Sequence, residues 1–597
     1  MSAKPKPFKK QKIDVQKKLA GLLLPVFALR RPGDIGVGDT QCVIDAIEFL
    51  AKHGMTVLQL LPINETGADN SPYNALSSIA LDPVYLTLAP ELVPGLSQST
   101  IDERVDSQLL HELAKGPVRY PQVKSIKLAI LQDAYDTLIG GANKGATRGK
   151  AKTSMAREIA AFAAFKTANK WLETYSLFRA LVQENNDSAV WTQWPIEHQN
   201  LASATKLANE SEHLTRQMDF FKYVQWVAFS QWAQVRAHAD KHGVELMGDI
   251  PFGISRYSAD VFGNRDLFDL ERSGGAPPET FFQSDKFTAV WGQNWGIPLY
   301  RWQNHEKTNY QFWRERVQET AKIFHYFRID HVLGFFRVYA FPWIPERNGE
   351  FVNLSPEQAK KLTGGKLPGF EPRPDTPQEN AALNCEDGTR LLSMILDAAG
   401  DTKVVAEDLG MVPSYVRPRL TEMGIPGFVI PIFERVSDFD RSFRGRQTYE
   451  PLSLVTLGTH DHEPIASFYE GLSKWWHGPD GDNGWQEVRR LMQFLELDAD
   501  NPPVHFDDRL HRRLIEVLLD TPSWLAVLMV SDLFGTTQRF NEPGIAGDSN
   551  WSQRLDRPLV EYAQDDHYGP LLSWLTAELK SAGRSHGDLV GASHASV

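Results

Sequence analysis

Eight short apolar segments recur along this 597-residue chain, and they limit its fold more than any other feature of the sequence. Helical patterns separate most of them, for example Cys42–His53 and Phe312–Ile323. Apolar strands that alternate with helices indicate βαβ units and a parallel sheet with both faces covered. The segments therefore predict an α/β fold, a (β/α)8 TIM barrel, with strands at Gly21–Phe27, Thr56–Pro62, Val244–Pro251, Phe324–His331, Lys403–Asp408, Gly427–Phe433, Leu454–Asp461 and Trp524–Phe534.

The spacing of the predicted strands also predicts the domain organisation. The long gap after the second strand indicates an inserted subdomain at residues 88–215, and its patterns are largely helical. Residues 21–87 are expected to start the barrel, and residues 216–584 to form its remainder. Within that remainder, scattered glycines and prolines predict a smaller loop subdomain at residues 346–398.

The two ends of the chain differ in composition from the rest. Residues 1–20 are rich in lysine, and no signal-peptide cleavage pattern follows them, so we expect a disordered tail. Residues 585–597 are rich in glycine, serine and histidine and predict a flexible tail. The chain has 2 cysteines, which excludes a disulfide scaffold and, with no signal peptide predicted, favours a cytoplasmic location.

Charge and hydropathy exclude two classes of partner. The net charge of −12 argues against nucleic acid, because such partners need a basic face to neutralise phosphates. The apolar runs, such as Gly21–Leu29 and Trp524–Val530, are too short to cross a bilayer. We therefore expect neither a nucleic-acid nor a membrane partner.

Four acidic residues lie at or just beyond the C-terminal ends of four predicted strands. They are Asp249, Asp330, Glu407 and Asp461. A single aspartate in such a place often caps the following helix. In a TIM barrel, however, the C-terminal rim carries the active site, and four acids from four strands would converge there. The sequence therefore predicts an active site lined by carboxylates.

Cleavage of a glycosidic bond requires this kind of site. One carboxylic acid protonates the leaving oxygen, and a second carboxylate attacks the sugar or activates water. Arg328 and Asp330 are two residues apart on one strand and so share a face, where the guanidinium would keep Asp330 ionised as a nucleophile. Glu407 follows an apolar strand, where burial would favour the protonated acid. The alternative for Arg328 and Asp330 is a structural salt bridge.

Two other chemistries are weakly indicated. His460-Asp461-His462 resembles the HxH motif of metal-dependent hydrolases, but there the motif belongs to the first strand, and here it lies on the seventh. Gly36-Val37-Gly38 lacks the third glycine of a dinucleotide-binding loop. We therefore expect no metal in the chemical step and no organic cofactor.

Several motifs, in order along residues 21–554, match one family. The chain resembles the 4-α-glucanotransferases (amylomaltases, or disproportionating enzymes) of the α-amylase superfamily. The matching motifs include Ser71-Pro72-Tyr73-Asn74, Gly248-Asp249-Ile250-Pro251, Gly292-Gln293-Asn294-Trp295-Gly296, Arg328-Ile329-Asp330-His331, Ala406-Glu407-Asp408-Leu409-Gly410, Thr459-His460-Asp461, Asn541-Glu542-Pro543-Gly544 and Asn550-Trp551. The resemblance implies transfer of α-1,4-glucan segments between malto-oligosaccharides or other glucans.

The resemblance also implies a role for each candidate site residue. Asp330 is similar to the family's nucleophile, Glu407 to its general acid/base and Asp461 to its transition-state stabiliser. The implied substrate-binding residues are Arg328, His460, Asp249, Trp295, Asn541, Ser71 and Tyr73. Trp295 would stack on an acceptor sugar; the alternative is that it packs in the core. Ser71-Pro72-Tyr73-Asn74 is also good turn chemistry, which is the alternative for Ser71 and Tyr73.

The sequence departs from the family at the loops that would hold the glucan. His462-Glu463-Pro464 replaces the usual residues after Asp461. This leaves open the preferred chain length and the ratio of transfer to hydrolysis. The alternative functions are an α-1,4-glucan hydrolase, in which water resolves the intermediate, and a catalytically silent glucan-binding protein.

Overall fold

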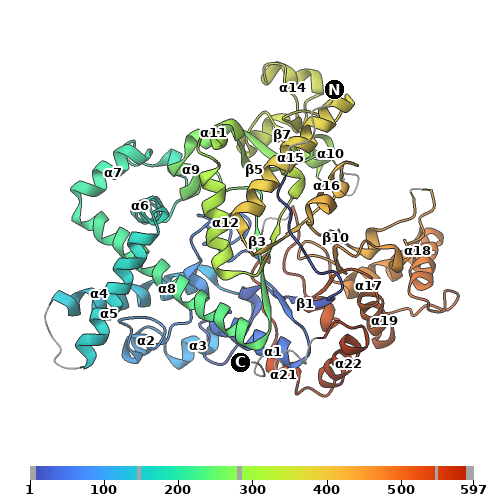
Figure 1. Ribbon diagram of the computed structural model, residues 1–597, viewed down its shortest axis with the longest axis horizontal. Coiled ribbons are helices and arrows are strands. Elements are labelled where there is room, and N and C mark those ends of the chain that lie inside the picture. The colour runs from blue at the N-terminus through green and yellow to red at the C-terminus, as the bar shows by residue number, and fades with distance from the viewer. Residues whose placement is uncertain are drawn as a thin grey trace.

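The computed structural model describes residues 8–143, 150–278, 285–437, 439–544, 547 and 549–585. At its centre lies an eight-stranded parallel sheet with the order β10-β11-β12-β1-β2-β3-β6-β9 (Figure 1). The N–H of Ala406 donates to the carbonyl of Pro426 (2.9 Å) and joins the two outer strands. The predicted TIM barrel is therefore confirmed, with strands β1 (Leu19–Leu23), β2 (Val57–Gln59), β3 (Glu245–Ile250), β6 (Tyr326–Ile329), β9 (Lys403–Ala406), β10 (Gly427–Val429), β11 (Ser453–Thr456) and β12 (Leu525–Met529).

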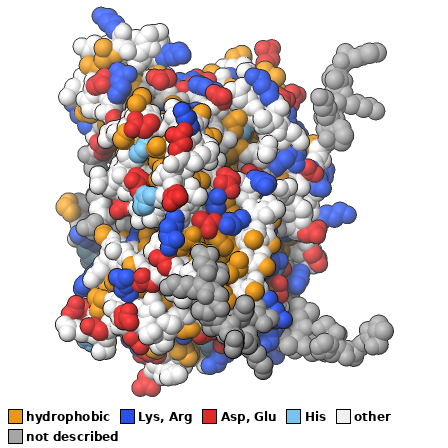
Figure 2. Space-filling view, turned by 90° about the vertical axis from the view of Figure 1, so that its left-hand side faces the viewer, with side chains coloured by type: hydrophobic (Ala, Val, Ile, Leu, Met, Phe, Trp, Pro, Cys, Tyr) orange, Lys and Arg blue, Asp and Glu red, His pale blue; other side chains and the backbone are white. Residues whose placement is uncertain are grey.

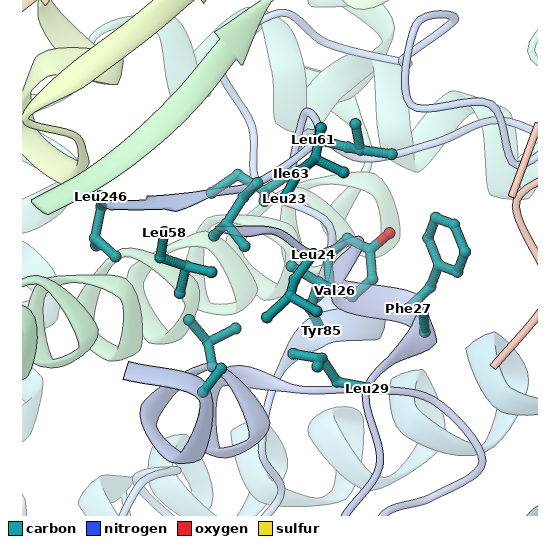
Figure 3. Packing of buried hydrophobic residues seen from close by; sticks show 14 of the residues in the cluster. Leu23, Leu24, Val26, Phe27, Leu29, Leu58, Leu61, Ile63, Tyr85 and Leu246 are labelled. Atoms are coloured by element: carbon teal, nitrogen blue, oxygen red, sulfur yellow. The ribbon is translucent and has the colours of Figure 1, made fainter. Parts of the chain in front are cut away.

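Each of the eight strands lies inside its predicted segment or overlaps it, and each is shorter. The first ends at Leu23 rather than Phe27, because Pro25 has no N–H for the ladder; Val26–Ala28 then forms a 3-10 helix. Leu24, Val26 and Phe27 nevertheless stay buried and pack with Tyr85 in the cluster of Figure 3. Burial on both sides of the barrel sheet explains why these segments are apolar without alternation.

Amphipathic helices surround the barrel. Asp39 begins α1 by accepting the N–H groups of Gln41 and Cys42, and the buried side of the helix carries Val43 and Ile47. The covering helices are α1 (Thr40–Lys52), α8 (Glu212–His242), α12 (Gln311–Ile323), α15 (Gln378–Ala399), α16 (Val416–Met423), α17 (Ile465–Trp476), α18 (Gly481–Phe494), α19 (Asp508–Leu519) and α22 (Tyr568–Ser581). Shorter helices are α9 (Ala259–Gly263), α10 (Lys286–Trp291), α11 (Trp302–Lys307), α13 (Asn348–Phe351), α20 (Val530–Leu533) and α21 (Leu559–Tyr562).

A run of helices follows β2, where the sequence predicts an insertion at 88–215. They are α2 (Gln98–Arg104), α3 (Ser107–Leu113), α4 (Tyr120–Asn143), α5 (Lys150–Ala168), α6 (Trp171–Glu184) and α7 (Leu201–Glu210). The expected boundary at residue 215 falls inside α8, a 31-residue helix that continues from this region to the start of β3. In Figure 1, α4 to α8 lie to the left of the barrel strands.

A second sheet was not predicted. It has four antiparallel strands in the order β5-β4-β7-β8, with bounds β4 (Phe268–Ala276), β5 (Gln293–Tyr300), β7 (Val338–Phe341) and β8 (Gly369–Glu371). The expectation of a loop over residues 346–398 is wrong in part. That range contains α14 (Pro356–Leu362), β8 and most of α15, and α15 packs on α12 as a barrel helix.

The lysine-rich segment also differs from expectation. The sequence predicts a disordered tail over residues 1–20, but β1 begins at Leu19 and Gln11 is bound to the barrel. The Gln11 amide donates to the carbonyls of Val404 (2.7 Å) and Gly424 (2.9 Å) and accepts the N–H of Val404 (2.9 Å). Residues 1–7 and 586–597, which complete the two predicted tails, lie outside the described residues.

The surface shows no single-sign field on the face seen in Figure 2, where acidic and basic side chains are interspersed. Within the described ranges, none of the helices has the length and apolar character needed to span a membrane.

Candidate active site

The predicted acids lie at one end of the barrel. Asp249 is the penultimate residue of β3, Asp330 and Glu407 directly follow β6 and β9, and Asp461 lies in the loop after β11. Because all eight strands are parallel, these positions share the C-terminal rim. The fold therefore converts four distant sequence positions into one acid-lined surface.

Arg328 is the centre of this surface. Its buried guanidinium donates through Nη1 to Asp249 Oδ2 and through Nη2 to Asp330 Oδ1 (2.8 Å). The register of β3 and β6 places Asp249 opposite Arg328, which explains the first contact. Two ion pairs hold the guanidinium in one orientation, and the guanidinium in turn fixes the position of the Asp330 carboxylate.

Asp249 and Tyr73 form the buried support of Arg328. The Tyr73 hydroxyl donates to Asp249 Oδ2 (2.8 Å), and Arg328 Nη1 donates to the same hydroxyl oxygen (3.3 Å). Burial raises the pKa of Asp249, and the Arg328 guanidinium opposes this shift. With its side chain 1% exposed, Asp249 acts on the site through Arg328.

Glu407 lies beside the same guanidinium. Its Oε2 accepts the N–H of His331 (2.7 Å), and its Oε1 accepts the N–H of Leu409 (3.2 Å). Burial raises the pKa of Glu407, and the Arg328 guanidinium 3.9 Å away opposes this shift. A carboxyl group with a raised pKa holds its proton at higher pH, which suits a general acid.

Asp461 has a different environment from Glu407. The Asn541 amide donates to Asp461 Oδ1 (2.6 Å), and His460 Nε2 lies 3.3 Å from Oδ2. Burial opposes ionisation of Asp461, but His460 and the Asn541 amide outweigh it, so its pKa lies below the usual value. The shift thus favours the protonated form of Glu407 and the ionised form of Asp461.

A contact between two rings connects Tyr73, which binds Asp249, with His460, which lies beside Asp461. The Tyr73 ring stacks on His460 with centroids 5.0 Å apart and an interplanar angle of 11°. Trp551 lies 5.8 Å from each ring and adopts a left-handed backbone conformation (φ 59°). The Asn550-Trp551 motif contains this residue, but no sequence pattern predicts its place beside Tyr73 and His460.

Two predicted substrate-binding residues lie at the edge of this network. Trp295 is on β5 of the second sheet rather than in a loop; its ring is 40% exposed and meets the His331 ring edge-on at 4.8 Å. Ser71 has no described contact with the acids. Its Oγ accepts the Tyr73 N–H (3.3 Å) and its carbonyl the Asn74 N–H (3.1 Å), so it shapes the turn that places Tyr73.

The departure after Asp461 has a structural consequence. His462 Nδ1 accepts the Thr459 N–H (3.1 Å), and its ring lies 5.2 Å from Phe433. This contact fixes the loop that carries Asp461. His462 therefore supports the loop conformation rather than meeting His460 around a shared centre.

His331 orients Glu407 through its backbone N–H, which no sequence pattern predicts. It adopts φ 42° and ψ 55°, a left-handed conformation that turns its N–H toward Glu407. Its ring contacts Trp295, so one residue links the second sheet to the predicted acid/base. The Arg328-Ile329-Asp330-His331 motif names the residue, but no sequence pattern gives its backbone conformation.

We expect His331→Val to lower the kcat of this site about 5- to 150-fold, because a β-branched residue resists this conformation by about 1–3 kcal/mol. His331→Asn, which tolerates the left-handed region, should keep kcat within a few-fold. Steady-state kinetics with unfolding temperatures compares the two. Equal losses in both variants would show that the ring, and not the backbone, matters.

Comparisons with known proteins identify the family of the chain. The sequence profile of the 4-alpha-glucanotransferase family matches residues 24–559. The chain is 31% identical over 554 residues to the 4-alpha-glucanotransferase of Chlamydia caviae, covering 91% of each chain, and 26% identical over 546 residues to that of Thermus thermophilus, covering 90% of this chain and 94% of the relative.

Solved structures show the same fold. The amylomaltase from Streptococcus agalactiae, in complex with acarbose, has a TM-score of 0.72 and 20% identity, and the match covers 95% of this chain and 100% of that one. The amylomaltase from Corynebacterium glutamicum also has a TM-score of 0.72, with 19% identity over 94% of this chain and 75% of that one. With the profile spanning nearly the whole barrel, the chain belongs to the 4-alpha-glucanotransferase family.

Proposed function

We propose that this chain transfers α-1,4-glucan segments between malto-oligosaccharides or other glucans by a retaining double displacement, with Asp330 as nucleophile and Glu407 as general acid/base. One observation carries the mechanism. Arg328 Nη2 lies 2.8 Å from an oxygen of Asp330 and 3.9 Å from an oxygen of Glu407. These two oxygens are therefore at most about 7 Å apart, which admits the separation of about 5–5.5 Å between the two carboxyl groups of retaining enzymes.

The first displacement breaks the donor. Protonated Glu407 gives its proton to the glycosidic oxygen while the Asp330 carboxylate attacks the anomeric carbon. The bond from that carbon to the leaving oxygen breaks, a glycosyl ester forms on Asp330, and the shortened glucan leaves with the proton. In this proposal Asp461 and His460, whose side chains lie 3.3 Å apart, hold hydroxyls of the sugar as it flattens toward an oxocarbenium ion.

The second displacement builds the product. Glu407, now ionised, removes the proton from the 4-hydroxyl of an acceptor glucan, and the hydroxyl oxygen attacks the anomeric carbon. The ester bond to Asp330 breaks, and both carboxyl groups return to their starting states. No step requires a metal or an organic cofactor.

Maltotriose as the only sugar tests this function. Chromatography should show free glucose together with a ladder of longer oligomers, which is the signature of transfer. Shortening alone would instead favour the α-1,4-glucan hydrolase, and unchanged maltotriose would favour the silent glucan-binding protein.

A cytoplasmic location stays a prediction; fractionation of the source cells, followed by immunoblotting, checks it.

Trp295→Ala is expected to raise the acceptor concentration needed for transfer about 3- to 10-fold, because stacking of a sugar on an exposed ring is lost. Water should then resolve more of the intermediate, and the unfolding temperature should fall by only a few degrees. Initial rates at varied acceptor concentration measure the effect.

Trp343 is a matched control for Trp295. It is 1% exposed and stacks on Phe351, so Trp343→Ala should remove about 3–5 kcal/mol of stability. If Trp295→Ala destabilised the chain as strongly as Trp343→Ala while transfer and hydrolysis kept their ratio, Trp295 would be a packing residue.

A further inference from the structure

A group of three potential metal ligands lies on the outer helices of the barrel. It consists of Glu48 on α1 and His238 and His242 on α8. One ligand atom from each, a carboxylate oxygen or a ring nitrogen, lies within 4.8 Å of the other two. Across the described part of the chain, this is the one group of three His, Cys, Asp or Glu side chains that meets this criterion.

The helices bring these side chains together from sequence positions about 190 residues apart. His238 and His242 are four residues apart and therefore share a face of α8, with ring centroids 4.1 Å apart. That face meets α1, since the two helices pack together in the lower part of Figure 1. Each helix ends near the group and leads into β2 or β3, so the group lies by the strand N-termini, opposite the acids.

The distances suit a tetrahedral ion. His238 Nε2 lies 3.1 Å from Glu48 Oε1. Zinc bonds of about 2.0–2.2 Å place neighbouring tetrahedral ligands about 3.3–3.6 Å apart. Small side-chain rotations, chiefly of the exposed Glu48, would therefore bring all three ligands to bonding distance.

Both histidines have a ring nitrogen available to bind a metal ion. His238 Nε2 is shielded from solvent and, despite the nearby Glu48, makes no hydrogen bond of good geometry. His242 Nδ1 lies 2.9 Å from the His238 carbonyl and donates to it, which leaves the Nε2 lone pair free.

We propose that Glu48, His238 and His242 form a structural site for a divalent transition-metal ion, with Zn²⁺ the preferred occupant. Two imidazoles and one carboxylate match the ligand preference of zinc and leave one position for water. The C-terminus of α8 adds the negative end of its helix dipole, which favours a cation there. The ion would join the first barrel helix to α8, far from the glucan, and so stabilise the barrel without entering the reaction.

Zinc titration of the tag-free full chain, stripped with EDTA, tests the proposal. Calorimetry should give one Zn²⁺ per chain with a Kd on the order of 1 μM or tighter. Co²⁺ should give the visible absorption of a tetrahedral site. Zinc should raise the unfolding temperature by a few degrees, because it binds the folded state.

Glu48→Gln and His242→Gln should each weaken zinc binding at least about 10-fold and abolish the thermal shift. His213→Gln is the matched control: His213 is also on α8 and lies 2.7 Å from Glu184, but it belongs to no group of three among the described residues. Glu48 is exposed, so its variant keeps the test valid if a histidine variant misfolds. No binding below about 100 μM, or equal losses in His213→Gln, would overturn the proposal.

Discussion

Asp330→Asn should lower turnover of maltotriose by about 10⁴-fold or more, the largest effect we expect of any single change. The substitution replaces the attacking oxygen with an amide at nearly constant volume. Arg328 stays paired because Asp249 retains its own contact with Nη1, so no buried cation is left without a partner. The fold should therefore survive, with an unfolding temperature within a few degrees of the parent.

Initial-rate assays together with thermal unfolding measure this effect. Asp532→Asn provides a matched control. Asp532 is also a buried acid near a strand end, after β12, and burial raises its pKa to about 7. The asparagine imitates its protonated form, so this variant should keep most of its turnover. Near-normal activity in Asp330→Asn would refute the assignment of the nucleophile.

Glu407→Gln should lower kcat on maltotriose about 10²- to 10⁴-fold, because the leaving oxygen loses its proton donor. With glucosyl or maltosyl fluoride as the substrate, the rate of the first step should change little, because fluoride leaves without protonation. The variant should then release about one equivalent of fluoride in a burst and stall, because the acceptor has no general base. Azide needs no base and should restart turnover.

The pH profile gives an independent check on Glu407. Its folded-state pKa is raised, so the acid form persists above the usual range of a glutamate and is lost as pH rises through that pKa. The kcat/KM of the parent on maltotriose should therefore fall as pH rises through the pKa of Glu407. The rate of fluoride release from the glycosyl fluoride should not show this fall. The acid role would be contradicted if Glu407→Gln lost activity equally on maltotriose and on the fluoride. It would also be contradicted if both activities of the parent fell over the same alkaline pH range.

The barrel could be predicted from the sequence because its strands are buried on both faces and stand out as apolar runs. Their ends could not, since Pro25 breaks the ladder inside an apolar run. The second sheet gave no signal: β4 reads Phe-Asp-Leu-Glu-Arg-Ser-Gly-Gly-Ala, and its register shifts near Gly274 disturb the alternation that marks a strand.

The acids of the site could be predicted because strand ends determine the rim. Their geometry could not, because it depends on contacts between distant positions. Tyr73 reaches Asp249 across 176 residues, and His331 serves Glu407 through a backbone angle that side-chain chemistry does not reveal. The zinc-ligand group is similar: His238 and His242 are visible at helical spacing, but Glu48 joins them only through helix packing.

The binding of Gln11 to β9 and to the C-terminal end of α16 has a consequence for synthesis on the ribosome. Gln11 is made roughly 400 residues before Val404 and Gly424, whose carbonyls accept its amide N–H groups, an interval of about 20–80 s at about 5–20 residues per second. β1 likewise cannot pair with β12 until β12 has been synthesised. During that interval the nascent sheet has open edges, and lysines such as Lys9, Lys10 and Lys12 are the kind of residue that keeps an open edge from pairing with another chain.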